Sequence, residues 1–251
     1  QFFGSAEKAW NSSSRDLMQI SGIGQQISKD FGNKKWLDLA FNEIEYCKNN
    51  QINILTIYDE IYPALLKECL DAPIVLFTKG NIEFNQFNNK KISIVGTRKM
   101  TNYGRNFIAE LCEGLAEFDV TIVSGLAYGC DIEAHSQALK NKLSTYAVMG
   151  TSFERIYPAA HKKVAVEMLI NGGWISEQPS FKTVIPEAFL QRNRIIAGIS
   201  DVTIVVESAF KGGSLVTAKF ANEYNREVFA LPGKTTDSLS VGCNYLIKTQ
   251  Q

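Results

Sequence analysis

The strongest constraint on this chain is a rhythm of short apolar segments that begins at residue 92. Each is four or five residues long, most are rich in Val and Ile, and helical stretches lie between them. The apolar segments are 92–95, 120–123, 145–149, 173–176, 202–206 and 227–231, and the helical stretches are 103–118, 131–140, 161–171, 187–199 and 214–225. Apolar strands that alternate with amphipathic helices are typical of a parallel sheet covered on both faces. The rhythm therefore predicts an α/β fold with a doubly wound parallel sheet of Rossmann type.

Composition narrows the class of protein further. The chain has 251 residues, of which 45% are hydrophobic and 21% charged, so a sizeable core is expected and wholesale disorder is excluded. Its 26 basic and 26 acidic residues cancel, which excludes a highly basic nucleic-acid coat but leaves room for a local basic patch. The five cysteines lack a CxxC pair, and we expect buried, reduced thiols in a cytoplasmic protein and no structural zinc site. No segment is typical of a membrane span or a signal peptide, so we expect no membrane partner.

The chain ahead of this rhythm divides into two parts. Residues 1–50 read as a small helical domain, with Ser12–Ser14 as a helix N-cap and a Gly22-Ile23-Gly24 turn between two short helices. The turn resembles the hairpin of helix-hairpin-helix and SAM-like modules, whose amides can contact a phosphate. A plain connection with Gly at a helix C-cap explains it equally well. Residues 51–90 read as a connector packed on the main domain, which we place at 91–251.

Glycines follow the predicted strands at their carboxyl ends. The strand-end segments are Gly96-Thr97-Arg98, Gly125 to Gly129, Gly150-Thr151, Lys211-Gly212-Gly213-Ser214 and Pro232-Gly233-Lys234. In an open parallel sheet these segments share one edge, where ligands bind. Glycine allows a close backbone approach there, and helix N-termini supply free N–H groups with a partial positive charge. The pattern predicts an anion-binding trough along this edge.

The shape of the anion follows from motifs that the chain lacks. The first strand is not followed by GxGxxG, and GxxxxGK[ST] is absent, so the motifs indicate neither a dinucleotide site nor a P-loop. An extended polyanion suits the edge better. Phe189 with Arg192 and Arg194 has the chemistry of a site that stacks bases and clamps phosphates. The alternative is that Phe189 belongs to the core and that one arginine pairs with Glu177 or Glu207.

The ordered motifs resemble the DNA-processing protein A family (DprA, also called Smf) of bacterial natural transformation. The matching segments include Ile94-Val95-Gly96-Thr97-Arg98, Ser124-Gly125-Leu126-Ala127-Tyr128-Gly129-Cys130-Asp131, Ala134-His135, Tyr157-Pro158, Arg192-Asn193-Arg194-Ile195-Ile196-Ala197-Gly198, Leu231-Pro232-Gly233 and Gly242-Cys243-Asn244-Tyr245-Leu246-Ile247. The resemblance spans about residues 60–248, and the helical start is similar to the family's SAM-like domain.

The resemblance implies an extended Rossmann domain that binds single-stranded DNA, forms a homodimer, protects incoming DNA and loads RecA recombinase onto it. It implies no catalytic residues, metal or cofactor. Carried over to this chain, Arg98 clamps a phosphate, glycines and Ser214 supply donors, and Phe189 with Arg192-Asn193 flanks a base. The implied DNA-binding residues are Thr97, Arg98, Gly125, Gly129, Phe189, Arg192, Asn193, Lys211, Gly212 and Ser214. The family's usual Gly-Ile-Asp is Gly129-Cys130-Asp131 here, and its usual Ser-Gly-Ser is Gly212-Gly213-Ser214, which removes one hydroxyl donor.

Two enzyme interpretations compete with binding. Asp131 and His135 share one helix face, and a structural pair explains that spacing better than acid–base catalysis. The alternative enzyme is a Rossmann-like nucleoside monophosphate phosphoribohydrolase of the lysine-decarboxylase-like group, whose loop PGGxGTxxE carries a catalytic Glu. After Gly212-Gly213 this chain has no Glu at the corresponding step.

We also expect the charges to be segregated in the fold. The basic residues at the sheet edge are Arg98, Lys99, Arg192, Arg194, Lys211 and Lys234, and the acidic residues on covering helices include Glu110, Glu113, Glu117 and Glu223.

Overall fold

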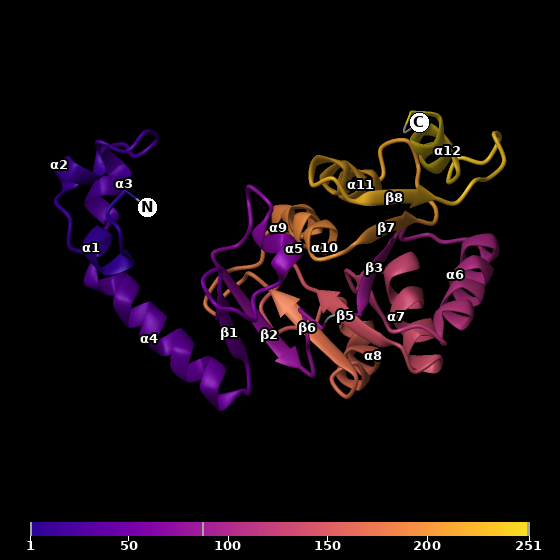
Figure 1. Ribbon diagram of the computed structural model, residues 1–251, viewed down its shortest axis with the longest axis horizontal. Coiled ribbons are helices and arrows are strands. Elements are labelled where there is room, and N and C mark those ends of the chain that lie inside the picture. Colours follow the sequence, from indigo (N-terminus) through magenta and orange to yellow (C-terminus); the bar gives the residue numbers. More distant parts are fainter. Residues whose placement is uncertain (1, 87, 250–251) are drawn as a thin grey trace. The chain divides into compact units, whose positions relative to one another are not determined.

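The computed structural model describes residues 2–86 and 88–249, and its chain divides into two compact units, residues 1–50 and 51–251 (Figure 1). The smaller unit contains the helices α1 (Ala6–Trp10), α2 (Ser14–Leu17), α3 (Gln25–Asp30) and α4 (Lys34–Asn49). Ser13 is the N-cap of α2 and its hydroxyl accepts from the Asp16 N–H. The Gly-x-Gly turn joins α2 to α3, with Gly22 at φ 89° and Gly24 as the N-cap of α3. That residues 1–50 form a SAM-like domain stays a prediction.

The larger unit is built on one eight-stranded sheet. Its strands are β1 (Asn53–Thr56), β2 (Val75–Gly80), β3 (Lys90–Val95), β4 (Val120–Ser124), β5 (Ser144–Val148), β6 (Gly172–Ser176), β7 (Val202–Val205) and β8 (Glu227–Ala230). The spatial order is β1-β2-β6-β5-β4-β3-β7-β8. All pairs from β6 to β8 are parallel, so the predicted doubly wound α/β fold is confirmed.

The segment 51–90 is part of the sheet. β1 pairs antiparallel with β2, and β2 pairs antiparallel with β6 through the register Phe77↔Ser176. Between these two strands lies the short helix α5 (Ala64–Lys67). The segment predicted as a connector therefore extends the parallel sheet by two antiparallel strands, because its apolar run pairs with the backbone of β6.

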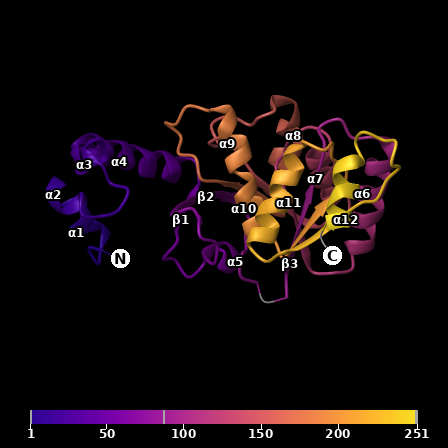
Figure 2. The same cartoon turned by 90° about the horizontal axis from the view of Figure 1, so that it is seen from above.

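Successive residues along each strand serve opposite faces of the sheet, as the pleat requires. Ile94 lies in a buried cluster with Ile108 and Cys112, whereas Val95 lies in the cluster of Ile195 and Ala218. α6 (Asn102–Leu115), α7 (Cys130–Lys140) and α8 (Lys162–Glu167) cover one face, and α10 (Asn193–Gly198), α11 (Gly213–Glu223) and α12 (Val241–Thr249) cover the other (Figure 2).

Two predicted helices differ in detail from the structure. The helix expected over 187–199 is formed by α9 (Pro186–Gln191) and α10, which meet at Arg192. The Ile195 N–H donates to the Arg192 carbonyl at 2.9 Å, an i to i+3 bond that tightens the chain there. The helix expected over 161–171 begins with the 3₁₀ turn η1 (Ala159–His161) and ends at Glu167.

All five cysteines are buried free thiols, as predicted. Burial raises the pKa of the Cys112 thiol to about 12, which makes it a poor nucleophile at neutral pH. Among the described residues, no helix is long and apolar enough to cross a bilayer.

Candidate nucleic-acid interface

The order of strands reverses at β3, which has β4 on one side and β7 on the other. Such a switch point opens a crevice at the carboxyl ends of the strands. A pocket of about 940 Å³ lies there. Its lining comes from the turn after β3, Ala127 in the loop after β4, the first turn of α7, the loops after β5 and β7, helices α9 and α10, and the start of α11. The crevice that the strand pattern predicts is therefore present.

The turn after β3 is held from two sides. The Thr97 N–H donates to the Glu207 carbonyl at 2.7 Å, and the Thr97 carbonyl accepts from the Cys130 N–H at 3.2 Å. Gly129 has φ 74°, and a Cβ at this position would lie 2.2 Å from the Thr97 carbonyl oxygen. This close packing fixes the backbone of Arg98, whose exposed side chain lines the pocket.

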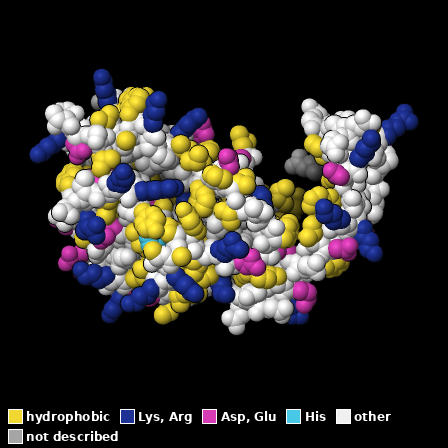
Figure 3. Space-filling view, turned by 180° about the vertical axis from the view of Figure 1, so that it is seen from behind, with side chains coloured by type: hydrophobic (Ala, Val, Ile, Leu, Met, Phe, Trp, Pro, Cys, Tyr) yellow, Lys and Arg dark blue, Asp and Glu magenta, His cyan; other side chains and the backbone are white. Residues whose placement is uncertain are grey.

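Three exposed cations line the pocket, namely Arg98, Lys99 and Arg155. Within residues 2–86 and 88–249, none of them forms an ion pair. Lys and Arg side chains are spread over much of the face drawn in Figure 3. The chain has zero net charge, yet its pocket carries positive charge without ion-pair partners among the described residues. A phosphate ligand requires such local positive charge.

The first turn of α11 borders the pocket. The Gly212 N–H donates to the Ala209 carbonyl at 2.9 Å, and the Ser214 hydroxyl donates to the Ser208 hydroxyl at 2.9 Å. Both groups therefore have partners inside the loop. The N–H groups of Gly213 and Ser214 are the first of the helix, where backbone donors lack intrahelical partners and favour anions.

An aromatic pair forms another part of the wall. The half-buried ring of Phe189 lies 5.3 Å from the exposed ring of Tyr157, centroid to centroid, and both line the pocket. Phe189 also packs against the backbone of Gly150. The two ring planes are tilted by 54° from each other, so the pair places aromatic rings, not one flat surface, beside the cations, and each ring can stack a base.

Arg192 lies at the base of the pocket and is only 5% exposed. Its guanidinium donates to the Gly125 carbonyl at 2.6 Å and to the Val148 carbonyl. Burial lowers the pKa of Arg192 to about 10, against the charge of Asp131 that raises it, so the side chain stays charged at neutral pH. A Cβ on Gly125 would lie 2.1 Å from this guanidinium, which explains the glycine.

Residues 53–250 match the sequence model of the DNA recombination-mediator protein A family. The chain belongs to this family. It is 36% identical over 250 residues to Protein Smf of Synechocystis sp., covering 98% of this chain and 63% of that protein's length. It is 40% identical over 193 residues to DNA processing protein DprA of Streptococcus pneumoniae, covering 77% of this chain and 67% of that protein.

Solved structures of DNA processing protein A share the fold. The X-ray structure from Streptococcus pneumoniae superposes with a TM-score of 0.81 and 33% identity, over 94% of this chain and 80% of that one. The protein from Helicobacter pylori, whose structure concerns its single-stranded DNA binding mode, superposes with a TM-score of 0.71 and 32% identity, over 80% of this chain and 88% of that one. The predicted family membership is therefore confirmed.

The structure places the predicted family site residues in two groups. Thr97, Arg98, Phe189, Arg192, Asn193, Gly212 and Ser214 line the pocket, whereas Gly125, Gly129 and Lys211 do not. The Gly125 carbonyl is taken by Arg192, Gly129 packs under the Arg98 turn, and Lys211 is exposed in the loop before α11. Asn193 donates through Nδ2 to the Gly213 carbonyl at 3.4 Å, which joins α10 to α11.

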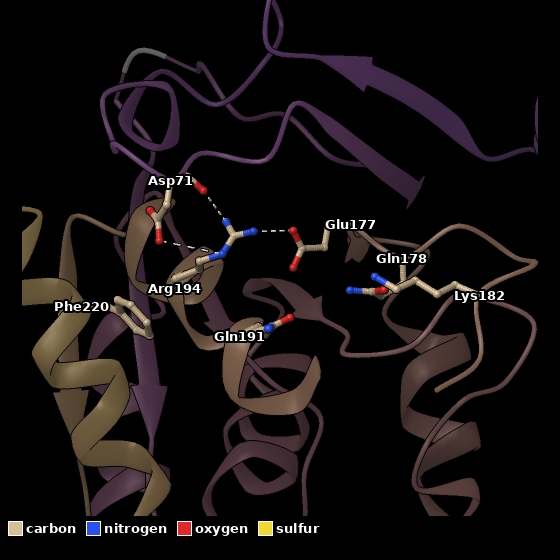
Figure 4. A pocket seen from close by; sticks show the side chains of 7 residues that line it. All are labelled: Asp71, Glu177, Gln178, Lys182, Gln191, Arg194 and Phe220. Carbon is tan, nitrogen blue, oxygen red and sulfur yellow. Dashed lines mark hydrogen bonds and ion pairs between the residues drawn. The ribbon is translucent and has the colours of Figure 1, made fainter. Parts of the chain in front are cut away.

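Arg194 has a different environment from Arg192. Its guanidinium pairs with Glu177 and donates to the Asp71 carbonyl at 2.7 Å (Figure 4). The pairing of one arginine with Glu177, left open from the sequence, is thus observed. Glu207 instead accepts from the Thr101 N–H at 2.8 Å, at the start of α6. Arg194 therefore contributes no free charge to the pocket, and the exposed Lys234 lies outside its lining.

Arg155 and Tyr157 are lining residues outside the predicted site set. Arg155 lies in the irregular loop after β5 and belongs to no recognisable motif. Tyr157 stood in the Tyr157-Pro158 segment that supports the family resemblance, but its role at the site depends on contact with Phe189. The only sequence signal for these two site residues is that a basic and an aromatic residue follow shortly after the Gly-Thr strand end.

Asp131 and His135 are both buried on α7 and have separate partners. The Asp131 carboxylate accepts from the Ala127 N–H at 3.3 Å, and His135 Nδ1 lies 2.7 Å from the Thr145 hydroxyl oxygen. Burial raises the pKa of Asp131, whereas burial lowers the pKa of His135 to about 3. This arrangement supports the structural interpretation of the pair.

The buried His135 leads to a prediction about acid stability. Its pKa falls from 6.5 to about 3 on folding, so between these values the unfolded chain binds a proton that the folded chain does not. The free energy of unfolding should therefore fall with decreasing pH, by about 2 kcal/mol from this group between pH 6.5 and pH 5. Urea unfolding across this range, with His135→Gln compared to the parent, measures the contribution. Equal pH slopes in the two proteins would contradict it.

Proposed function

We propose that this protein binds single-stranded DNA in the pocket at the carboxyl edge of its sheet. The observation that carries the proposal is the convergence of Arg98, Lys99 and Arg155, all without ion pairs among the described residues, on a pocket that also holds the Tyr157–Phe189 pair. Cations that follow a backbone and aromatic rings that stack bases are the two components of single-strand binding. The relative from Helicobacter pylori is described by its single-stranded DNA binding mode, which supports the same ligand.

Each component has a distinct task in this proposal. Phosphates lie against the exposed guanidinium of Arg98 and the first N–H groups of α11, while bases stack against Phe189 and Tyr157. Arg192 stays below the bound strand, because its guanidinium is already bonded to backbone carbonyls of β5 and of the loop after β4. Backbone charge and stacking do not depend on base identity, so the protein should accept strands of any sequence.

We place this binding in bacterial natural transformation, where the protein protects incoming DNA in the cytoplasm and loads RecA recombinase onto it. It acts by binding and not by catalysis in this proposal. The protein functions as a homodimer, and the segments 214–225 and 240–248 are the candidates for its interface. Tyr245 and Ile247 on α12 are exposed and support that choice.

Removal of Arg98 tests the phosphate contact. Each phosphate neutralised contributes about −0.7 to the slope of log affinity against log salt concentration, so three cations predict a slope of about −2 for the parent. In Arg98→Ala we expect affinity for oligo-dT to fall about 5- to 10-fold and the slope to become shallower by about 0.7. Filter binding of oligo-dT and of duplex DNA across a salt series measures both quantities.

Arg105→Ala is the matched control. Arg105 is an exposed arginine that pairs with Glu133 on the neighbouring helix and lies outside the pocket lining. Its loss should leave affinity and slope unchanged. A parent protein with a flat salt response, or an Arg98→Ala variant that binds oligo-dT like the parent, would contradict the proposed site.

A further inference from the structure

We propose that Tyr128 forms a second base-stacking surface and that the bound strand leaves the pocket across the Arg98 turn to reach it. This inference rests on the proposed binding of single-stranded DNA and names the path of the strand outside the pocket. Tyr128 is neither a pocket residue nor one of the predicted contacts, and its position follows from the packing of the loop after β4.

The loop after β4 places Tyr128 directly beside the pocket. Its neighbour on one side, Ala127, lines the pocket, and its neighbour on the other side, Gly129, packs against the backbone of Arg98. Tyr128 therefore lies between a residue of the pocket lining and a residue that packs against the Arg98 turn. A strand held at Arg98 needs only to continue over this turn to meet the tyrosine ring.

The ring of Tyr128 is supported from one side and open on the other. It meets the ring of His161 edge to face, with a centroid distance of 4.7 Å and an interplanar angle of 73°. His161 is itself buried and fixed, because its Nδ1 lies 2.7 Å from the Leu126 carbonyl oxygen. Tyr128 nevertheless remains 49% exposed, so a held aromatic ring presents free surface to a base. Such a ring loses little conformational entropy when a base stacks on it.

Lysines follow both segments that contact the loop of Tyr128, the Arg98 turn and the turn of His161. Lys99 follows Arg98 in the turn after β3, and Lys162 with Lys163 opens α8 directly after His161. All three lysines are exposed, and none has an ion pair among the described residues. Cations that alternate with aromatic rings continue the chemistry of the pocket beyond its rim, which favours a single strand over a compact ligand.

The test compares Tyr128→Ala with the parent on dT oligomers of about 4 to about 16 nucleotides. Loss of one stacked base should weaken binding about 5- to 20-fold on the longest oligomers, with a loss that grows with oligomer length. Tyr128→Phe keeps the ring and should restore parental affinity. Phe118→Ala, which removes an exposed aromatic ring in the turn before β4 at the opposite edge of the sheet, is the matched control and should leave the length series unchanged.

A second readout locates the contact directly. The probe is a set of oligomers, each with 5-iodouracil at a single position. With the label near one end of the strand, we expect a photocross-link to the peptide that carries Tyr128. With the label at other positions, we expect cross-links to the peptides that carry Tyr157 or Phe189. Parental affinity of Tyr128→Ala at every length, with cross-links only inside the pocket, would overturn this inference and leave the proposed function standing. Absence of oligomer binding by the parent would overturn both.

Discussion

Replacing Arg192 with Met is expected to lower the free energy of unfolding by about 3–5 kcal/mol at pH 7. The buried guanidinium bonds to the carbonyls of Gly125 and Val148, and these acceptors would lose their partner inside the protein. Burial raises the pKa of Asp131, and its carboxyl would lose the cation that opposes this rise. An unpaired buried acceptor costs about 1–3 kcal/mol, and an uncompensated buried charge costs more.

Urea unfolding followed by circular dichroism measures this loss. Arg192→Lys keeps the charge but lacks the planar fork that reaches two carbonyls, so we expect an intermediate loss. The matched control is Arg98→Met, where the side chain is exposed and the free energy of unfolding should change by no more than about 0.5 kcal/mol. Parental stability of Arg192→Met would contradict the structural role and return this arginine to the set of DNA contacts.

Replacing Gly129 with Ala is expected to lower the free energy of unfolding by about 2–4 kcal/mol. Gly129 has φ 74° and ψ −121°, a conformation that L side chains rarely adopt. The new Cβ would also lie 2.2 Å from the Thr97 carbonyl oxygen and 2.7 Å from the Arg98 carbonyl carbon. The turn would have to move, so the variant should lose affinity for oligo-dT together with stability.

Gly114→Ala provides the matched control, because Gly114 lies in α6 and a Cβ there would meet no atom within 4 Å. This change should stabilise the protein by about 0.5–1 kcal/mol through helix propensity. Differential scanning calorimetry and oligo-dT binding on both variants separate the effects. A Gly129→Ala variant with parental stability and parental affinity would show that the close packing under Arg98 is not required.

The two arginines of Arg192-Asn193-Arg194 show where sequence reasoning ends. Residues two apart on a helix point about 200° from each other, so their separation onto different faces follows from helix geometry alone. Which face meets the carbonyls of β5 and of the loop after β4 depends on how α10 docks on the sheet. The structure decides that Arg192 is buried and that Arg194 pairs with Glu177, and neither outcome follows from spacing.

The strands and helices of the larger unit could be predicted because their signals are local. Apolar runs and helical periodicity identify elements, and glycines at the strand ends mark the ligand edge of any parallel sheet. Arg98 and the start of α11, which line the pocket, are predicted at the ligand edge in this way. Arg155, Tyr157 and the partners of Gly125 and Gly129 depend on contacts between loops far apart in sequence, for which the sequence holds no periodic signal.

By itself, the sequence determined the alternation of strands and helices, the ligand edge and the family, since each depends on residue order along the chain. Only the tertiary structure decided which cations remain free. Arg98, Lys99 and Arg155 lack ion pairs among the described residues, whereas Arg192 and Arg194 bond to protein groups. The physical reason is that a charge is available to a ligand only where folding brings no acceptor or carboxylate against it, and that depends on packing between distant segments.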